Sequence, residues 1–358
     1  MKPIKITHFT LSSIQIDLKT PFKTALREVS QVDDVVLHIH TDSEHIGIGS
    51  APPTVAITGE DKSDISNYIT QVLEPLYLNK PLDDPETLLR LLDTLDGHTS
   101  AKAAVDMALY DLFAKIKNVP LYTYLNGTQT KLKSNITISL NDVATMVHDA
   151  KLAVKEGYTL LKVKVGGSVL DDIERVFKIR SAIGRDITLR IDANQAWDLE
   201  SAKAICEGIA PFNIELIEQP LKANEIVNMA ILQASTPIAL LADESVFSLD
   251  DAKNVIAKKA ANFINIKLMK CGGIYQAIKI AKYAKAHNIN CMIGCMIESP
   301  ISIAAAAHFA MSQSNVTMYD LDAPLLCKSH PVIESLQIKN DTIALNSTPG
   351  LGVSLSVY

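Results

Sequence analysis

The chain has 358 residues, of which 47% are hydrophobic, and a formal net charge of −6 at pH 7. Its length predicts two domains, unless one of them is a large α/β barrel. The Lys and Arg residues form no long cluster, so we expect no nucleic-acid binding. No segment approaches the roughly 20 apolar residues that a membrane-spanning helix needs, so we expect no membrane association.

The first residues and the cysteines indicate a reducing compartment. The start, MKPIKITHFTLSSIQI, alternates like a β-strand and lacks the apolar core and cleavage site of a signal peptide. The five cysteines are odd in number and have no CxxC spacing, which argues against a disulfide framework and a zinc knuckle. We therefore expect a cytoplasmic protein.

Residues 1–125 have the pattern of an α+β region. The stretches 4–18 and 32–49 alternate like antiparallel strands, whereas 64–77 and 101–116 are typical of helices. After Leu326 short strands return in IESLQI and DTIALN. We expect this tail, 327–358, to pair with the first region.

Between these parts, in residues 126–326, short β-branched runs alternate with amphipathic stretches. The runs are NITISL (135–140), LLKVKV (160–165), ITLRID (187–192), IELIE (214–218), IALLAD (238–243), FINIK (263–267), CMIG (291–294) and VTMYDLD (316–322). Strands that alternate with single helices form right-handed βαβ units. Eight in series favour a closed (β/α)8-type barrel, and no GxGxxG motif supports a dinucleotide-binding fold.

Charged residues fall at the carboxyl ends of the predicted barrel strands, where active sites lie in such barrels. Asp192, Glu218 and Asp243 end the third, fourth and fifth strands. A single Asp there is usually a helix cap, but carboxylates on neighbouring strands about 5 Å apart can converge. Their mutual repulsion is removed by a cation, and ligands that are all oxygen favour Mg²⁺ over Zn²⁺. We expect one Mg²⁺ per subunit.

Three lysines flank this predicted metal site. Lys162 and Lys164 lie two residues apart on the second strand, so their side chains share a face, and Lys267 ends the sixth strand. A lysine near a cation and another lysine has a lowered pKa and can act as a base. Ion pairs with the carboxylates are the structural alternative, but they explain two flanking bases less well.

Two bases across a metal suit removal of a proton from one face of a carbon and its return to the other. The proton α to a carboxylate is too weakly acidic for an amine unless the enolate is stabilised. Mg²⁺ bound to the carboxylate oxygens supplies that stabilisation as a Lewis acid. The predicted chemistry is therefore proton transfer at the α-carbon of a carboxylate.

A set of motifs in fixed order resembles the enolase superfamily, muconate-lactonising subgroup, over nearly the whole chain. The motifs are KVK (162–164), DANQAW (192–197), EQP (218–220), ADES (242–245) and INIKLMKCGG (264–273). The resemblance implies an α/β fold, namely a (β/α)7β TIM-type barrel with an α+β capping domain formed by the N-terminal region and the C-terminal tail.

Within this subgroup the chain is most similar to the dipeptide epimerases of the L-Ala-D/L-Glu type. The resemblance implies that Lys164 and Lys267 are the acid/base catalysts and that Lys162 helps to hold the substrate carboxylate. In the DLDAP motif, Asp320 and Asp322 would bind the α-ammonium group, since two carboxylates can accept its hydrogen bonds. The implied reaction interconverts L-Ala-D-Glu and L-Ala-L-Glu in murein peptide metabolism by 1,1-proton transfer at the α-carbon of the C-terminal residue.

The same resemblance places substrate specificity in two capping loops. Arg27, in PFKTALREV, matches an arginine that binds the side-chain carboxylate of the second residue. The stretch APPTVAITGE (51–60) resembles the second loop, and Thr137 and Met296 match substrate-contacting positions. After its MIE core, GCMIESPIS (294–302) departs from the Ala-Glu pattern, so a broader dipeptide range stays open.

Two other functions also stay open. A reaction of the o-succinylbenzoate synthase or muconate cycloisomerase type would use the same lysines and metal, but its substrate has no ammonium group for Asp320 and Asp322. A non-catalytic peptide-binding protein would have lost a metal ligand or a base, and the sequence keeps them all. A small dipeptide is therefore the expected ligand, and we expect a homo-oligomer.

Overall fold

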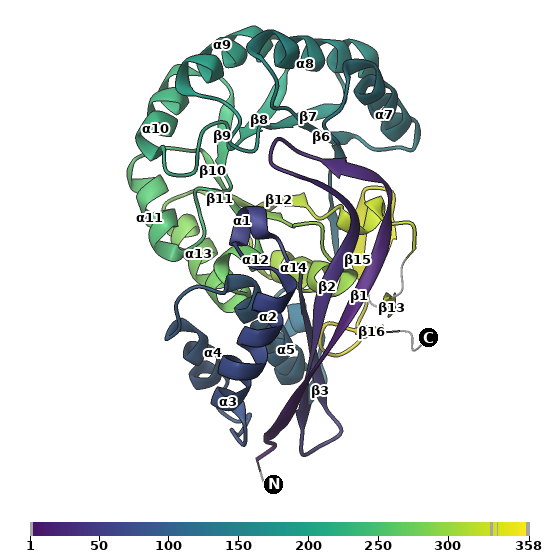
Figure 1. Ribbon diagram of the computed structural model, residues 1–358, viewed down its shortest axis with the longest axis vertical. Helices are drawn as coiled ribbons and strands as arrows, with labels where there is room; N and C mark the ends of the chain where they lie inside the picture. Colours follow the sequence, from purple (N-terminus) through teal and green to yellow (C-terminus); the bar gives the residue numbers. More distant parts are fainter. Residues whose placement is uncertain (1–2, 330–331, 335, 356–358) are drawn as a thin grey trace.

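In the computed structural model, a barrel of parallel strands ringed by helices lies above a smaller region of sheet and helices (Figure 1). The structure describes residues 3–329, 332–334 and 336–355. A long hairpin of β1 (Ile6–Lys23) and β2 (Glu28–Thr41) rises from the smaller region toward the barrel. The hairpin therefore carries residues from the start of the chain to the rim of the barrel.

The smaller region is an antiparallel sheet, β1-β2-β3, packed against helices. Its other elements are β3 (Ile46–Ala51), α1 (Val55–Thr58), α2 (Lys62–Tyr68), η1 (Ile69–Leu73), α3 (Glu74–Tyr77), α4 (Pro85–Asp93), α5 (Thr99–Ile116) and α6 (Leu121–Tyr124). A Cβ atom on Gly47 or Gly49 would collide with the backbone of Ala108 or Ala104 in α5. These two glycines therefore let the sheet approach the central helix closely.

The barrel consists of eight parallel strands in the order β12-β11-β10-β9-β8-β7-β6-β5. In chain order its elements are β5 (Ile136–Ile138), α7 (Val143–Lys155), β6 (Leu160–Lys164), α8 (Val169–Ile183), β7 (Thr188–Asp192), α9 (Leu199–Ile209), η2 (Ala210–Phe212), β8 (Ile214–Glu218), α10 (Ile226–Ser235), β9 (Ala239–Ala242), α11 (Leu249–Ala257), β10 (Phe263–Ile266), α12 (Leu268–Cys271), α13 (Ile274–Ala286), β11 (Asn290–Gly294), α14 (Pro300–Ser312) and β12 (Val316–Asp320). The eight predicted strands are confirmed, several of them shorter than expected.

The ring of strands closes between β12 and β5. The Asn135 backbone N–H donates to the Tyr319 carbonyl at 3.2 Å, and the Leu321 N–H donates to the Ser134 hydroxyl at 2.8 Å. A short 3-10 helix, η3 (Ala323–Leu326), follows β12 where an eighth α-helix would complete a (β/α)8 barrel. The observed fold is thus the (β/α)7β barrel with a capping region.

Side chains inside the barrel change from apolar to charged toward the carboxyl ends of the strands. Leu216, Leu241, Met292 and Met318 form a separate buried cluster. Because side chains alternate in direction with period two, Glu218 and Asp320 follow Leu216 and Met318 on the same inner face. The strands therefore present a charged layer directly above an apolar one.

The C-terminal tail contacts both parts of the molecule. Strands β14 (Leu336–Lys339) and β15 (Thr342–Leu345) form a sheet with β4 (Lys131–Lys133), which lies in the segment predicted to be barrel, while β13 (Val332–Glu334) pairs with β16 (Val353–Leu355). The first region pairs with the tail through two isolated β-bridges, Leu18 with Cys327 and Pro120 with Gly350. The tail thus pairs with the first region by isolated bridges, as expected, whereas the strand pairing of β15 is with β4. Ser335, in the predicted strand IESLQI, lies outside the described residues.

Two buried aspartates dock the capping region onto the barrel. Asp34, on β2, accepts a hydrogen bond from the backbone N–H of Ser299, which caps α14, at 2.9 Å. Asp106, on α5, accepts from the N–H groups of Ile274 and Tyr275, at the start of α13, at 2.5 and 3.2 Å. Both carboxyl groups thus satisfy free N–H groups at helix N-termini of the barrel.

Replacing Asp34 with asparagine is expected to remove a loss of stability at high pH. Burial raises the pKa of Asp34 to about 7, and the carboxylate of Asp33 adds to the shift. The folded state then holds the proton more tightly than the unfolded state, so stability is full below the unfolded pKa and falls as the pH rises to about 7. The loss amounts to at most ~4 kcal/mol.

Urea unfolding at about pH 5 and about pH 8 measures this difference. The parent chain should lose stability over that interval, and Asp34→Asn should lose less. Asp250→Asn, which removes an exposed ion pair with Lys253, is the control and should follow the parent. Parallel losses in the parent and in Asp34→Asn would contradict the assignment.

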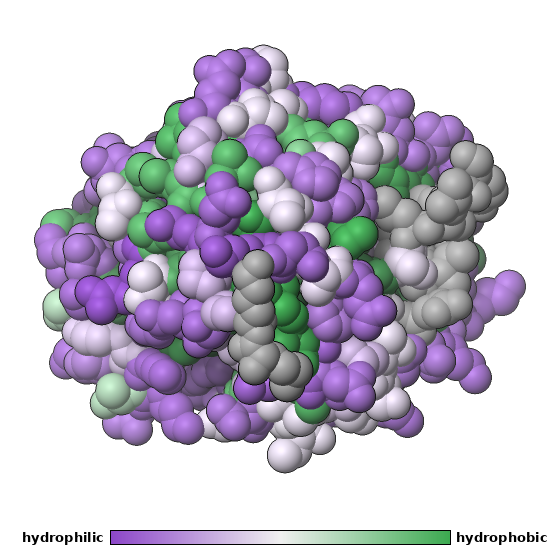
Figure 2. Space-filling view, turned by 90° about the horizontal axis from the view of Figure 1, so that it is seen from below, coloured by the Kyte–Doolittle hydropathy of each residue, from purple (hydrophilic) through white to green (hydrophobic). Residues whose placement is uncertain are grey.

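Hydrophilic side chains cover most of the lower face of the molecule, with hydrophobic ones scattered between them (Figure 2). This face is the end of the capping region that carries α3 and α4 in Figure 1. None of the helices in the described part of the chain combines the length and apolar character needed to cross a membrane.

Candidate active site

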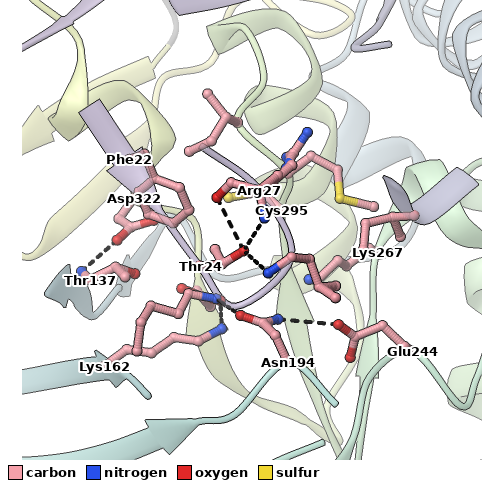
Figure 3. A pocket seen from close by; sticks show the side chains of 16 residues that line it. Phe22, Thr24, Arg27, Thr137, Lys162, Asn194, Glu244, Lys267, Cys295 and Asp322 are labelled. Carbon is pink, nitrogen blue, oxygen red and sulfur yellow. Dashed lines mark hydrogen bonds and ion pairs between the residues drawn. The ribbon is translucent and has the colours of Figure 1, made fainter. Parts of the chain in front are cut away.

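A cavity opens at the carboxyl ends of the barrel strands, beside the tip of the β1–β2 hairpin (Figure 3). It encloses about 550 Å³, its open mouth included. The wall is formed by Phe22, Thr24, Leu26, Arg27, Ile57, Thr137, Lys162, Lys164, Asn194, Glu244, Lys267, Cys295, Met296, Ile297, Asp320 and Asp322. Every residue that the sequence assigned to catalysis or substrate binding lies in this wall.

The hairpin tip is held in shape and fastened to the barrel. The Thr24 hydroxyl accepts hydrogen bonds from the N–H groups of Leu26 and Arg27 at 3.1 and 3.2 Å. The N–H of Lys23 donates to the Ser139 hydroxyl, beyond β5, at 2.6 Å. This turn presents Arg27 to the cavity.

The guanidinium group of Arg27 forms no ion pair or hydrogen bond with the described residues. Burial lowers its pKa, although a guanidinium keeps its charge in proteins. A half-buried cation without a partner is suited to bind an anionic group of a ligand. Ile57, which lies in α1, is part of the same wall. This position agrees with the expectation that residues 51–60 form a second capping loop.

The three predicted metal ligands lie together below the cavity wall. Lys164, Asp192 and Glu218 are neighbours in register across β6, β7 and β8. Asp243 follows β9 directly. All three carboxyl groups are at most 1% exposed, an environment in which an unpaired charge is costly.

Lysine ammonium groups compensate these carboxylates. Lys162 Nζ lies 2.9 Å from Asp192 Oδ2, 2.8 Å from Glu218 Oε2 and 2.6 Å from Asp320 Oδ2. Lys164 Nζ lies 2.6 Å from the same Asp192 oxygen. Each of these contacts is close enough for a charge-assisted hydrogen bond or ion pair.

On the other side of the barrel, two lysines share one carboxylate. Lys267 Nζ and Lys270 Nζ each lie 2.6 Å from an oxygen of Asp243. Lys270 is fully buried and also donates to the carbonyl of Asn265 at 3.0 Å. The sequence reasoning missed Lys270, although INIKLMKCGG contains it, because strand periodicity gives no direction to a side chain in the following turn.

The carboxylates differ in their affinity for protons because they compete for shared lysines. Burial opposes ionisation of Asp192, but Lys162 and Lys164 outweigh it and lower its pKa to about 2. Burial raises the pKa of Glu218 to about 8, and Asp192 adds to that shift. Lys162 therefore cannot neutralise all the carboxylates that it touches, and the cluster retains an excess of acidic groups.

The chemistry of the donor atoms suits Mg²⁺, although a lysine lies between two of the carboxylates. Glu218 Oε2 and Asp243 Oδ1 accept no hydrogen bond from the described residues, despite the nearby ammonium groups. As arranged here, the described His, Cys, Asp and Glu side chains form no group of three or more that could hold a metal ion, and Lys162 Nζ lies between two of the predicted ligands. Buried carboxylate oxygens with spare acceptor capacity are nonetheless the ligands that a hard divalent cation prefers.

Two further carboxylates lie at the far end of β12. Asp320 accepts hydrogen bonds from the Asn135 amide at 2.7 Å and from Lys162 at 2.6 Å. Asp322 accepts from the backbone N–H of Thr137 at 2.7 Å (Figure 3). Burial, followed by the charge of Asp320, raises the pKa of Asp322 to about 6. This pair forms an anionic corner that suits an ammonium group.

Several residues of the wall were not identified from the sequence. Asn194 and Glu244, within DANQAW and ADES, form a hydrogen-bonded pair across the cavity floor. Phe22 places its ring 5.7 Å from Lys164 Nζ. Both residues lie in motifs that carried the family resemblance, but only the folded barrel shows what they contact. Cys295 also lines the wall, and burial raises the pKa of its thiol well above the usual range.

Two family models match the chain. The model described as "Mandelate racemase / muconate lactonizing enzyme, N-terminal domain" matches residues 6–126, and "Enolase C-terminal domain-like" matches residues 145–357. A relative named L-Ala-D/L-Glu epimerase from Clostridium acetobutylicum is 42% identical over 351 residues, which cover 97% of this chain and 98% of that protein.

Two solved structures are similar to this chain over almost its whole length. The substrate-liganded L-Ala-D/L-Glu epimerase of Bacillus subtilis has a TM-score of 0.97 at 40% identity and covers 99% of this chain and 100% of its own. The dipeptide epimerase of Enterococcus faecalis, complexed with Mg and L-Leu-L-Tyr, has a TM-score of 0.94 at 35% identity, with 98% and 99% covered. The chain therefore belongs to the enolase superfamily, in its mandelate racemase and muconate lactonizing enzyme family.

Proposed function

We propose that the chain is a Mg²⁺-dependent dipeptide epimerase, which inverts the α-carbon of the C-terminal residue and acts on L-Ala-D-Glu and L-Ala-L-Glu. The observation that carries this proposal is that Lys164 and Lys267 reach one cavity from β6 and from the end of β10, above buried carboxylates. The similar proteins named above act on or bind dipeptides, and one of them is complexed with Mg.

Asp192, Glu218 and Asp243 would hold the metal. When bound, Mg²⁺ would withdraw negative charge from the substrate carboxylate and thereby make the α-proton more acidic. These carboxylates now act on the lysines as counter-ions: burial lowers the pKa of Lys267, but Asp243 outweighs it and raises that pKa well above 10.5. A carboxylate that shares its charge with a cation raises the pKa of its lysine less, so the lysine can lose its proton more readily.

Lys164 and Lys267 would exchange the proton between the two faces of the substrate. One lysine, neutral at the start, takes the α-proton and becomes an ammonium group. The other, an ammonium group at the start, gives its proton to the opposite face and becomes neutral. The number of protons is unchanged, and the α-carbon is inverted.

The remaining residues of the wall would bind the substrate. Asp320 and Asp322 would accept the hydrogen bonds of the α-ammonium group, and Lys162 would lie beside the substrate carboxylate. Arg27 would bind the side-chain carboxylate of the second residue, with Thr137 and Met296 in contact with the substrate. A broader range of dipeptides is part of the proposal, since the Enterococcus faecalis relative is complexed with L-Leu-L-Tyr.

We also propose a cytoplasmic location, a homo-oligomer and a role in murein peptide metabolism. All five cysteines are free, which supports a reducing compartment. The family models, which match residues 6–126 and 145–357, support a domain boundary near residues 125 and 126.

Incubation of the protein with L-Ala-L-Glu and Mg²⁺ in D₂O tests the proposed reaction. Deuterium should enter at the Glu α-carbon and L-Ala-D-Glu should form, both followed by NMR. Absence of deuterium exchange would refute the proposed reaction. Turnover of an o-succinylbenzoate precursor or of a muconate would instead favour the elimination or cycloisomerisation alternative.

The Arg27→Leu variant tests the specificity for Glu separately. Loss of a hydrogen bond to a charged group should reduce turnover of L-Ala-L-Glu by about ten- to a hundredfold. L-Ala-L-Leu, which has no side-chain carboxylate, is the matched control and should change little. Equal losses on both dipeptides would remove Arg27 from its proposed role and leave the epimerase proposal intact.

A further inference from the structure

Asn194 occupies an unusual backbone position in the cavity floor. It follows β7 by two residues and has a left-handed conformation, with φ of +43°. Its backbone N–H donates to Asp192 Oδ1 at 3.0 Å. The side chain is 6% exposed and lines the cavity between β6 and β9. Non-glycine residues seldom adopt this conformation, although asparagine tolerates it better than most.

The orientation of the Asn194 amide is fixed by Glu244. The amide NH₂ group donates to Glu244 Oε1 at 3.1 Å, and Glu244 as a carboxylate can only accept. The amide oxygen is therefore directed the other way, where it accepts a hydrogen bond from Lys164 Nζ at 3.0 Å. Glu244, Asn194 and Lys164 thus form a chain from β9 to β6, visible in part in Figure 3.

The contact with Asn194 differs in kind from the other contacts of Lys164. Asp192 Oδ2, at 2.6 Å, is a charged partner and belongs to a proposed metal ligand. The amide oxygen is neutral, and a lysine donates an N–H to it in both its charged and its neutral form. The hydrogen bond to Asn194 therefore orients Lys164 without placing a second negative charge beside it.

Lys267 is positioned by other means. Its ammonium group contacts Asp243, and its stem passes Gly294 on β11, where an added Cβ atom would lie 3.0 Å from Lys267 Cε. Among the described residues, neither Asp243 nor Gly294 is hydrogen-bonded to Asn194, and Glu244 acts on Lys267 through its charge without a hydrogen bond. The two lysines are thus held by separate parts of the barrel.

We propose that Asn194 is a positioning residue for Lys164 alone, with Glu244 setting the direction of its amide. The inference rests on the proposed function, in which the two lysines serve opposite faces of the α-carbon. Loss of Asn194 should then slow proton removal from one epimer only. A residue that merely supported the fold or the metal ligands would slow both epimers alike.

The test measures α-proton exchange into D₂O separately from pure L-Ala-L-Glu and pure L-Ala-D-Glu. The Lys164→Ala variant first identifies the epimer that depends on Lys164. Asn194→Ala should slow exchange from that epimer by about tenfold or more, as expected for the loss of one hydrogen bond to a charged group. Exchange from the other epimer should change by less than about threefold.

Lys267→Ala is the matched control, because it removes the other proposed base and should slow exchange from the other epimer. Asn194→Gly, whose backbone tolerates the left-handed conformation, also removes the amide and should slow the same epimer as Asn194→Ala. If Asn194→Ala does not fold, this second variant alone decides the matter. Equal slowing of both epimers, or no slowing of either, would overturn the proposal. Absence of exchange in the parent protein would instead refute the proposed function.

Discussion

Replacing Lys267 with alanine will abolish epimerisation, while one of the two epimers continues to exchange its α-proton with solvent. The inversion needs a base on one face of the carbon and an acid on the other, and Lys164 alone can supply only the first. Loss of a general acid or base typically reduces a rate by about 10²- to 10⁴-fold. We expect a loss in the upper part of that range, because no other lysine in the described wall of the cavity except Lys162 could replace it, and Lys162 contacts three carboxylates.

The measurement compares formation of the second epimer with deuterium uptake by each pure dipeptide. Lys164→Ala should also abolish epimerisation, but deuterium exchange should then be retained by the epimer that loses it in Lys267→Ala. Lys253→Ala, which removes a part-exposed lysine paired with Asp250, is the control and should match the parent. Continued epimerisation in Lys267→Ala at more than about one per cent of the parent rate would exclude the two-lysine mechanism.

The layout of the barrel could be predicted from the sequence because local patterns determine it. Alternation along LLKVKV requires that Lys162 and Lys164 share a face, and the structure places both in the cavity wall. A carboxylate at the end of a predicted strand is likewise at the end of the real one, as for Asp192 and Glu218. These inferences need only the period of a strand and the common direction of parallel strands.

Contacts across the barrel could not be predicted in the same way. Lys162 reaches Asp320 on β12, a contact that depends on the closure of the ring between β12 and β5. The Asn194 amide bridges β6 and β9 through side-chain geometry that no spacing in the sequence expresses. Pairing of the tail with β4 was missed for a similar reason: Lys131–Lys133 is too short and too polar to show a strand pattern.

Replacing Lys162 with methionine will destabilise the metal-free protein strongly, and Mg²⁺ will restore part of the loss. Its ammonium group is the shared counter-ion of Asp192, Glu218 and Asp320, all of them at most 4% exposed. Removing one partner of a buried ion pair costs about 3–5 kcal/mol, since the remaining charge stays buried without compensation. A divalent cation bound to the native state supplies positive charge and stabilises it by mass action.

The loss of stability with rising pH should also be larger in the variant than in the parent. In the parent, Asp192 has a pKa lowered to about 2, so its contribution is present above the unfolded pKa and is lost as the pH falls toward 2. Without Lys162, Asp192 keeps only Lys164 as its counter-ion, so its pKa rises and it contributes less stability at neutral pH. The pKa of Glu218, which burial already raises to about 8, rises further, and its contribution is lost as the pH increases. The metal-free variant should therefore be most stable in mild acid.

Thermal unfolding in EDTA and in excess Mg²⁺, at acidic and neutral pH, measures both effects. Lys115→Met is the matched control, because Lys115 pairs at 2.6 Å with the fully buried Asp111 in the capping region. It should also lower the melting temperature, but Mg²⁺ should raise it no more than in the parent. If Mg²⁺ stabilised the parent and both variants equally, the cation would bind away from Lys162, and the assignment of Asp192 and Glu218 as its ligands would be wrong.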